Sequence, residues 1–225
     1  MTDVKISWLL LKRIFIESRR GKTLARILLN HALSDVRLSS AILDFGSSSE
    51  SASYNRFLKY EKPYQVTRTD LYRDGPGMVK LDLEKPFPLP GNSFDHITCF
   101  NVLEHIYSYR NCIGEAYRVL KSGGTFVGGT PFLVSYHSDP HDYFRYTHEG
   151  IEKIFTEIGF VCEQIISLGF GPLTVAAEFF TRTTPNFLNF VFTIPAVLLD
   201  SLILRLKPKH RGRYALGYMY VFKKS

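Results

Sequence analysis

The chain contains little cysteine, methionine or tryptophan: three, three and one of its 225 residues, respectively. Cys99, Cys112 and Cys162 lie far apart, so they lack the paired spacing of a zinc site, and we predict no metal centre. Such scarce thiols fit a reducing cytosol, where burial is the default interpretation of a cysteine. We therefore expect a cytoplasmic protein.

The first 38 residues also lack the uninterrupted apolar run of a secretory signal. Lys12 and Arg13 break the run, and no small-residue cleavage site follows. Apolar residues instead recur at roughly helical spacing, in Trp8–Leu11, Ile14–Ile16 and Ile27–Leu29. This pattern predicts two helices, which form an N-terminal helical cap over residues 1–38.

Acidic residues are outnumbered, with 21 Asp and Glu against 28 Lys and Arg, and the formal net charge is +7. This excess indicates an acidic partner surface such as anionic lipid, or it serves solubility alone. No recognised nucleic-acid-binding motif is present, so we expect no nucleic-acid partner. With 45% hydrophobic residues, the chain is large enough for one α/β domain with a full core, which we assign to residues 39–225. The oligomeric state stays open.

Residues 39–70 contain the pattern that organises this domain. Ala41–Leu43 is an apolar, partly β-branched run, as expected of a strand buried on both faces. Gly46 permits a sharp turn, and a serine after it can cap a following helix. Asp70 lies just past the next expected strand, Tyr64–Thr67, and a carboxylate about 20 residues after such a turn suits a ribose diol. The pattern predicts a nucleoside cofactor, although an ordinary capped strand-turn-helix contains the same residue types.

The turn lacks the later glycines of a dinucleotide-binding loop. Ser48 and Glu50 occupy this region, and a carboxylate there would repel a phosphate. S-adenosylmethionine has no phosphate, and its sulfonium and ammonium groups make Asp44 attractive. The sequence therefore favours S-adenosylmethionine as the cofactor, and an NAD-dependent oxidoreductase is a poor alternative.

Further apolar runs alternate with helical segments and so predict a parallel sheet. The expected strands are Met78–Leu83, Phe94–Phe100, Thr125–Gly129, Phe160–Ser167 and Tyr214–Phe222, and the expected helices are Ile113–Leu120 and Glu149–Ile158. Ligands of such sheets bind at the carboxyl ends of the strands. Four polar residues fall at these ends: Asp44, Asp70, Asp82 and Asn101.

Four short motifs follow one another along residues 40–168: Ile42–Gly46, Leu89–Asp95, Val102–His105 and Glu115–Gly124. In order and spacing they resemble the class I S-adenosylmethionine-dependent methyltransferases of the large type 11 group. The resemblance implies an α/β, Rossmann-like fold. Its sheet would have seven mostly parallel strands, with the last one antiparallel.

The resemblance also implies residues for the methionine end of S-adenosylmethionine. Asp44 and Gly46 would hold it, with Ser48 in the same loop. Phe100 and Asn101 would offer backbone groups to the ligand amine.

The nucleoside end would lie on the neighbouring strand ends. By the same resemblance, Asp70 would hold the ribose and Asp82 would face the adenine amino group, with Leu71 and Leu83 flanking the ring. The chain departs from the family where Ser48 and Glu50 replace the usual glycines.

Residues 136–147 follow the fifth expected strand and overhang the same edge of the sheet. The loop gathers His137, His141, Asp142 and Arg145 with several tyrosines, groups that bind hydroxyls, stack on a sugar ring and accept a proton. A subset of the family, often associated with bacterial surface-polysaccharide synthesis, has a very similar Pro-His-Asp-Tyr-Phe-Arg-Tyr-Thr stretch. We therefore predict O-methylation of a hydroxylated acceptor such as a sugar or glycan intermediate, with these four residues as catalytic candidates.

The loop residues also have a structural interpretation. Asp142 would bond Arg145 as a clamp, and Thr147 would cap the following helix. Glu104 and His105 are a further catalytic pair, although Glu104 would also serve to tie down its own loop.

Residues 170–213 separate the last two strands as a helical insertion. Its apolar stretch is interrupted by Pro195 and Asp200, which argue against a transmembrane helix. Five cations follow at once: Arg205, Lys207, Lys209, Arg211 and Arg213. An apolar helix beside a basic cluster is typical of an interfacial element on an anionic membrane, whereas a lid or a dimer surface is the alternative.

The insertion affects both location and function. Docking through residues 186–213 would place the protein at the periphery of the inner membrane. The alternative to an enzyme is a non-catalytic cofactor-fold module at a membrane-associated assembly, which is favoured if Ser48 and Glu50 abolish cofactor binding.

Overall fold

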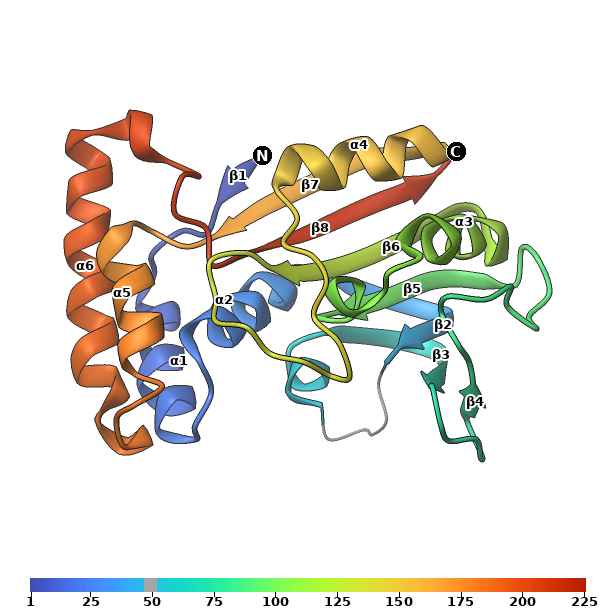
Figure 1. Ribbon diagram of the computed structural model, residues 1–225, viewed down its shortest axis with the longest axis horizontal. Helices are drawn as coiled ribbons and strands as arrows, with labels where there is room; N and C mark the ends of the chain where they lie inside the picture. The colour runs from blue at the N-terminus through green and yellow to red at the C-terminus, as the bar shows by residue number, and fades with distance from the viewer. Residues whose placement is uncertain (47–51) are drawn as a thin grey trace.

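The computed structural model describes residues 1–46 and 52–225. Its described strands form one sheet of eight, in the order β1-β7-β8-β6-β5-β2-β3-β4 (Figure 1). The strands are β1 (Thr2–Asp3), β2 (Arg37–Phe45), β3 (Lys59–Asp70), β4 (Met78–Lys80), β5 (Phe94–Phe100), β6 (Leu120–Pro131), β7 (Phe160–Leu168) and β8 (Gly217–Lys224). Strand β8 is antiparallel to β6 and β7, and the other pairings are parallel.

This topology confirms the predicted α/β, Rossmann-like fold with a mostly parallel sheet and an antiparallel last strand. The predicted number of seven strands is not confirmed. Thr2 and Asp3 pair with Ile166 and Ser167 and add an eighth strand at the edge of the sheet. Two residues are too short a run to carry a periodic pattern, so this strand could not be predicted from the sequence.

The helices are α1 (Trp8–Arg19), α2 (Leu24–Ala32), α3 (Tyr109–Val119), α4 (His148–Ile158), α5 (Pro172–Phe180) and α6 (Asn189–Leu206). Short 3₁₀ turns are η1 (Leu33–Asp35), η2 (Ser53–Arg56), η3 (Leu103–His105), η4 (Asn186–Leu188) and η5 (Pro208–His210). Thr147 caps α4 as expected, because its Oγ1 accepts from the N–H of Gly150 at 3.1 Å. Helix α3 ends at Val119, before the expected Leu120, and the chain enters β6 directly.

The central strands are buried on both faces, as their apolar composition predicted. In β2, Leu43 joins a core cluster with residues of α3 and α4, whereas Ile42 joins a second cluster with residues of α1 and α2. Successive residues of a strand point to opposite faces, so each residue of this pair serves one layer. The sheet is therefore covered on both faces, with helices in each layer.

Helices α1, α5 and α6 stand side by side beyond the carboxyl ends of β6 and β7 (Figure 1). Asp200 of α6 is fully buried, and its carboxylate accepts from the N–H of Leu173 at 3.3 Å and from the N–H and hydroxyl of Thr174 at 2.6 and 2.7 Å. These bonds satisfy free donors at the start of α5. The aspartate that interrupts the apolar stretch is thus a cap supplied by the neighbouring helix.

We expect Asp200→Ala to lower the free energy of unfolding by about 1.5–3 kcal/mol, the range for hydrogen bonds to a charged group. Asp200→Asn is the matched control, because its amide oxygen still accepts from the helix start, so it should cost less. Denaturant unfolding measures both variants. Unchanged midpoints in both would show that this contact does not hold α6 on α5.

Candidate functional site

A cavity of about 610 Å³ lies at the carboxyl edge of the sheet. Its floor includes Gly46, Asn101 and Pro131, which end or follow β2, β5 and β6. The α1–α2 turn and α2 form one wall, and the loop after β6 overhangs it. The size suits an organic ligand of cofactor dimensions.

Gly46 adopts a left-handed conformation with φ of 69° where β2 meets the cavity. A Cβ at this position would lie 2.7 Å from Cγ2 of Val102, so only glycine fits here. The N–H of Gly46 donates to Oγ1 of Thr69 at 3.2 Å. The turn is therefore fixed against β3 and keeps the backbone open toward the cavity.

Asp44 is buried behind this turn. Its carboxylate accepts from the hydroxyls of Thr98 at 2.6 Å and Tyr54 at 3.0 Å. Tyr54 lines the cavity, so Asp44 joins β2 and β5 to the cavity wall. Ser48, the other loop residue expected to bind the cofactor, lies outside the described residues.

Asp70 and Asp82 lie at adjoining strand ends, joined through the 2.8 Å bond from the N–H of Leu81 to the carbonyl of Asp70. Oδ1 of Asp70 accepts from the N–H groups of Tyr72 and Arg73 at 2.8 and 3.0 Å. These bonds close a turn and hold the carboxylate at the end of β3.

Asp82 is held similarly by its own loop, because its carboxylate accepts from the N–H of Glu84 at 3.0 Å and pairs with Lys85 at 3.0 Å. Burial acts to raise the pKa of Asp82, but these two partners lower it overall. Of the two expected ring-flanking residues, Leu71 is exposed and Leu83 is buried in the core. Neither aspartate lines the 610 Å³ cavity, so the residues predicted to hold the nucleoside lie outside it, and their role stays a prediction.

Phe100 and Asn101 both line the cavity. Asn101 has φ of 55°, and its N–H donates to the carbonyl of Gly129 at 2.8 Å. The backbone N–H is thus engaged in the sheet, and the groups available to a ligand amine here are carbonyl acceptors.

Arg26 of α2 is a cavity residue that the sequence reasoning missed. Among the described residues its guanidinium has no hydrogen bond or ion pair, and burial lowers its pKa. A guanidinium facing a cavity is suited to a carboxylate. The available signal was a single cation within the apolar run Leu24–Leu29.

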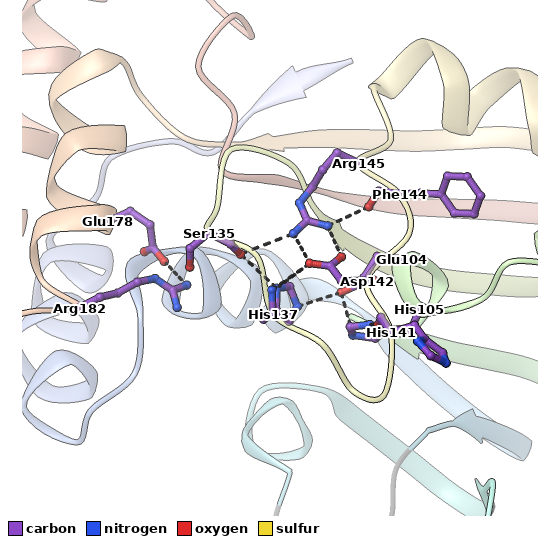
Figure 2. Close-up of polar contacts among 10 residues, drawn as sticks. All are labelled: Glu104, His105, Ser135, His137, His141, Asp142, Phe144, Arg145, Glu178 and Arg182. Carbon is purple, nitrogen blue, oxygen red and sulfur yellow. Dashed lines mark hydrogen bonds and ion pairs between the residues drawn. The ribbon is translucent and has the colours of Figure 1, made fainter.

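Asp142 and Arg145 form a two-pronged ion pair in the loop after β6 (Figure 2). Oδ2 of Asp142 also accepts from the N–H of His137 at 2.9 Å. The Arg145 guanidinium lowers the pKa of Asp142 to about 2. The contacts are those of the clamp interpretation, and a catalytic role for either residue stays a prediction.

Glu104, His105 and His137 converge below this clamp (Figure 2). Glu104 is fully buried, and its Oε1 lies 3.5 Å from Nε2 of His137 and 3.7 Å from Nε2 of His105. The carboxylate of Glu104 raises the pKa of His137. Glu104 and His105 belong to η3 after β5, so two strand ends bring the cluster together.

The two predicted catalytic histidines occupy different positions. His137 lines the cavity, whereas the side chain of His141 is exposed and does not line it. The backbone carbonyl of His141 accepts from Nδ1 of His105. The ring centroid of His141 lies 5.2 Å from that of Tyr143. Catalysis by His141 stays a prediction, and the geometry favours His137.

The family described as "Methyltransferase domain" matches residues 51–128. A curated demethylmenaquinone methyltransferase of Anoxybacillus flavithermus is 34% identical over 73 residues, which is 31% of this chain and 31% of that protein. The chain thus matches less than a third of the length of this relative. Both findings support the predicted S-adenosylmethionine-dependent methyltransferase.

Solved structures with this fold are similar over most of the chain. An S-adenosylmethionine-dependent methyltransferase from Mesorhizobium loti has a TM-score of 0.54 at 12% identity and covers 92% of this chain and 100% of its own. The [4+2]-cyclase SpnF has a TM-score of 0.56 at 14% identity and covers 89% of this chain and 80% of its own. At these identities the similarity shows the fold alone.

We predict that Asp142→Asn lowers stability at pH 7 by about 2 kcal/mol, because the pKa of this carboxyl is depressed in the folded chain. Because the pKa is depressed, the clamp stabilises the fold at pH values above the usual pKa of 3.8. This contribution disappears as the pH falls toward about 2. Unfolding free energies between pH 7 and pH 2.5 measure the effect. Parallel curves for both proteins would refute it.

Proposed function

We propose that the chain is an S-adenosylmethionine-dependent methyltransferase that methylates a hydroxyl group of a sugar or glycan intermediate. The observation that carries the proposal is the match between the cavity and the amino-acid end of the cofactor. Arg26 offers a guanidinium to a carboxylate, and the backbone at Phe100 and Asn101 offers acceptors to an ammonium group. Gly46 keeps the floor between them free of a side chain. When bound, S-adenosylmethionine supplies the methyl group.

The adjoining strand ends support the nucleoside part of the proposal. The loops fix the Asp70 and Asp82 carboxylates in place, so each binds a ligand with little further ordering. Asp70 would hold ribose hydroxyls, and Asp82 would hold an exocyclic amine. Leu71 supplies an exposed apolar side chain beside them.

The acceptor side is formed by the loop after β6 and by η3. Tyr107 and Tyr143 are exposed, and their ring centroids lie 5.3 Å apart. Exposed aromatic rings of this kind form platforms for sugar rings. The neighbouring Glu104–His105–His137 cluster would activate the acceptor hydroxyl, with His137 facing the cavity. The protein's main contribution is then to position the two reactants.

A second candidate is a protein with this fold that does not transfer methyl groups. The similarity to a cyclase supports this second candidate, because proteins with this fold have more than one kind of activity. The predicted alternative, a non-catalytic module at a membrane-associated assembly, belongs to the same class. Both candidates differ from a methyltransferase in the transfer experiment below.

We expect calorimetry to show binding of S-adenosylmethionine and S-adenosylhomocysteine but not of NAD. Asp70→Ala should weaken S-adenosylhomocysteine binding by about 1.5–3 kcal/mol, the range for hydrogen bonds to a charged group. Asp74→Ala, in the same exposed loop, is the matched control and should bind normally. Transfer of labelled methyl groups to glycan acceptors then separates a methyltransferase from both alternatives. A folded wild-type chain that binds neither S-adenosyl compound would refute the proposal.

We also propose peripheral membrane contact through α1, α5 and α6. In the described part of the chain, the segment Asn186–Leu206 is the one helix long and apolar enough to cross a membrane. Helix α6 buries Asn189, Thr193 and Asp200 together with two small or branched apolar residues, whereas large apolar side chains point outward. The exposed side chains are Trp8, Leu9, Phe15, Ile16, Phe179, Phe180, Phe187, Val191, Phe192, Leu198, Leu199, Leu202, Ile203 and Leu206. This distribution is the reverse of that of a helix facing water.

The cations after α6 support a bilayer as the apolar partner. Arg205, Lys207, Lys209, Arg211 and Arg213 are all exposed next to this surface. Basic clusters beside apolar helices bind anionic lipid headgroups. The apolar side chains would enter the interface while α6 stays packed on α5 and α1.

Binding to anionic vesicles should therefore occur at low salt and weaken, without vanishing, at high salt. Replacing the five cations by glutamine should weaken it at least about 100-fold, since each cation near an anionic surface is worth about 1 kcal/mol. The control replaces five exposed cations of the β3–β4 region, namely Lys59, Lys62, Arg73, Lys80 and Lys85. If the wild-type chain floats free of the vesicles at low salt, the surface is a lid or a dimer contact instead.

A further inference from the structure

Glu104 is a buried carboxylate whose oxygens both lack a hydrogen-bond partner among the described residues. Other fully buried carboxylates are satisfied: Asp200 by the start of α5, and Glu178 by the N-H of Ala25 and by Arg182. An unsatisfied buried carboxylate costs several kcal/mol unless a cation balances it. The charge of Glu104 acts on Arg26 and Arg145, but neither forms an ion pair with it in the described structure. Its only ion-pair contacts among the described residues are with the rings of His137 and His105.

The two histidines beside Glu104 have ring nitrogens whose roles are fixed by backbone carbonyls. Nδ1 of His105 contacts the carbonyl of His141, and Nδ1 of His137 lies 3.3 Å from the carbonyl of Ser135 (Figure 2). A carbonyl only accepts, so each Nδ1 carries the hydrogen. In the neutral rings, both Nε2 atoms therefore present lone pairs, and both face Oε1 of Glu104.

Three lone-pair donors thus converge on one point. Their ligand atoms all lie within 4.8 Å of one another, and the Glu104 oxygen is 3.5 and 3.7 Å from the two nitrogens. Ligands of a tetrahedral zinc ion at about 2.1 Å are separated by about 3.4 Å. Lone pairs this close repel one another unless a metal ion or a ring proton lies between them, and carbonyl-bound Nδ1 atoms are typical of metal-ligating histidines.

We propose that Glu104, His105 and His137 bind a divalent transition-metal ion of the zinc class. Two imidazoles and one carboxylate form a donor set that such ions accept, and a site with three protein ligands leaves at least one position open. His137 lines the cavity, so the open position faces the acceptor side. The cysteine spacing that argued against a metal centre carried no information on this site, because its ligands come from two strand ends.

The consequence for the reaction rests on the proposed function, whereas the metal site does not. An acceptor hydroxyl coordinated through its oxygen is a stronger acid, so it loses its proton to water more readily and becomes a better nucleophile. His137 would then act as a ligand and not as a proton acceptor. Substrates with a hydroxyl next to a second oxygen ligand would be favoured.

The test titrates chelator-treated full-length protein with Zn²⁺ by calorimetry and with Co²⁺ by visible absorption, without cofactor or acceptor. We expect one ion per chain and a Co²⁺ spectrum of low coordination number. Glu104→Gln, His105→Ala and His137→Ala should each weaken binding at least about 100-fold, because loss of a ligand exceeds the 10–100-fold cost of losing an outer partner. His148→Ala and His210→Ala, which lie outside the cluster, should bind normally.

A second readout keeps the test decisive if a variant folds poorly. Metal should raise the Tm of the wild-type chain, whereas Glu104→Gln should have a higher Tm than the wild type in chelator and respond little to metal. Binding that the three ligand variants leave within twofold would overturn the site, as would absence of stoichiometric binding. Failure to bind S-adenosylhomocysteine would refute the proposed function alone, since the metal titration requires no cofactor.

Discussion

The cost of burying a carboxylate shapes this molecule more than any other single constraint. An ionised carboxylate leaves water only if donors or cations replace its hydration. Asp44, Glu178 and Asp200 meet this requirement by accepting bonds from other elements: Asp44 from β5 and η2, Glu178 from the start of α2, and Asp200 from the start of α5. Asp44 thus joins β2 to β5 and η2, Glu178 joins α5 to α2, and Asp200 joins α6 to α5. Glu104 is the exception, and it lies beside His137, which lines the cavity.

These hydrogen bonds explain how the helical insertion, residues 170–213, contributes to two different surfaces. Because Glu178 and Asp200 hold α5 and α6 against the N-terminal helices, the insertion stands beyond the strand ends and does not cover the sheet. Its inner side contributes Arg182 to the cavity, and its outer side presents the apolar surface. An acceptor with a polar head and an apolar tail would meet both surfaces at once. The same geometry connects the proposed chemistry to the proposed membrane contact.

Local patterns were sufficient for much of this structure. Apolar runs marked the central strands, and strand ends placed Asp44, Asp70, Asp82 and Asn101 along one edge, because the period of a buried strand and the direction of a parallel sheet are local properties. The position of Arg26 in the cavity wall could not be predicted from local patterns, since it depends on how α2 packs. The Glu104–His137 contact joins residues 33 positions apart in different loops, and no spacing rule covers such a pair.

The loop after β6 shows the same limit at the level of single side chains. His137 and His141 looked alike in the sequence, as two histidines in a polar loop. The Asp142–Arg145 pair separates them, because Asp142 also holds the N–H of His137 and so turns that residue toward Glu104 and the cavity.

Helix α6 shows why composition alone could not decide between a membrane span and a surface helix. Its mean hydropathy is high enough for a membrane span, but its buried Asp200 bonds the start of α5 and its buried Asn189 bonds Thr184. Withdrawing the helix into a bilayer would break the Asp200 contacts and leave that carboxylate in hydrocarbon, at a cost of at least several kcal/mol. It would also pull on β8, which begins at Gly217, shortly after the helix ends, and pairs with both β6 and β7. In the proposed membrane contact, helix α6 would therefore lie along the membrane surface, with its apolar side outward and its polar side bound to the protein.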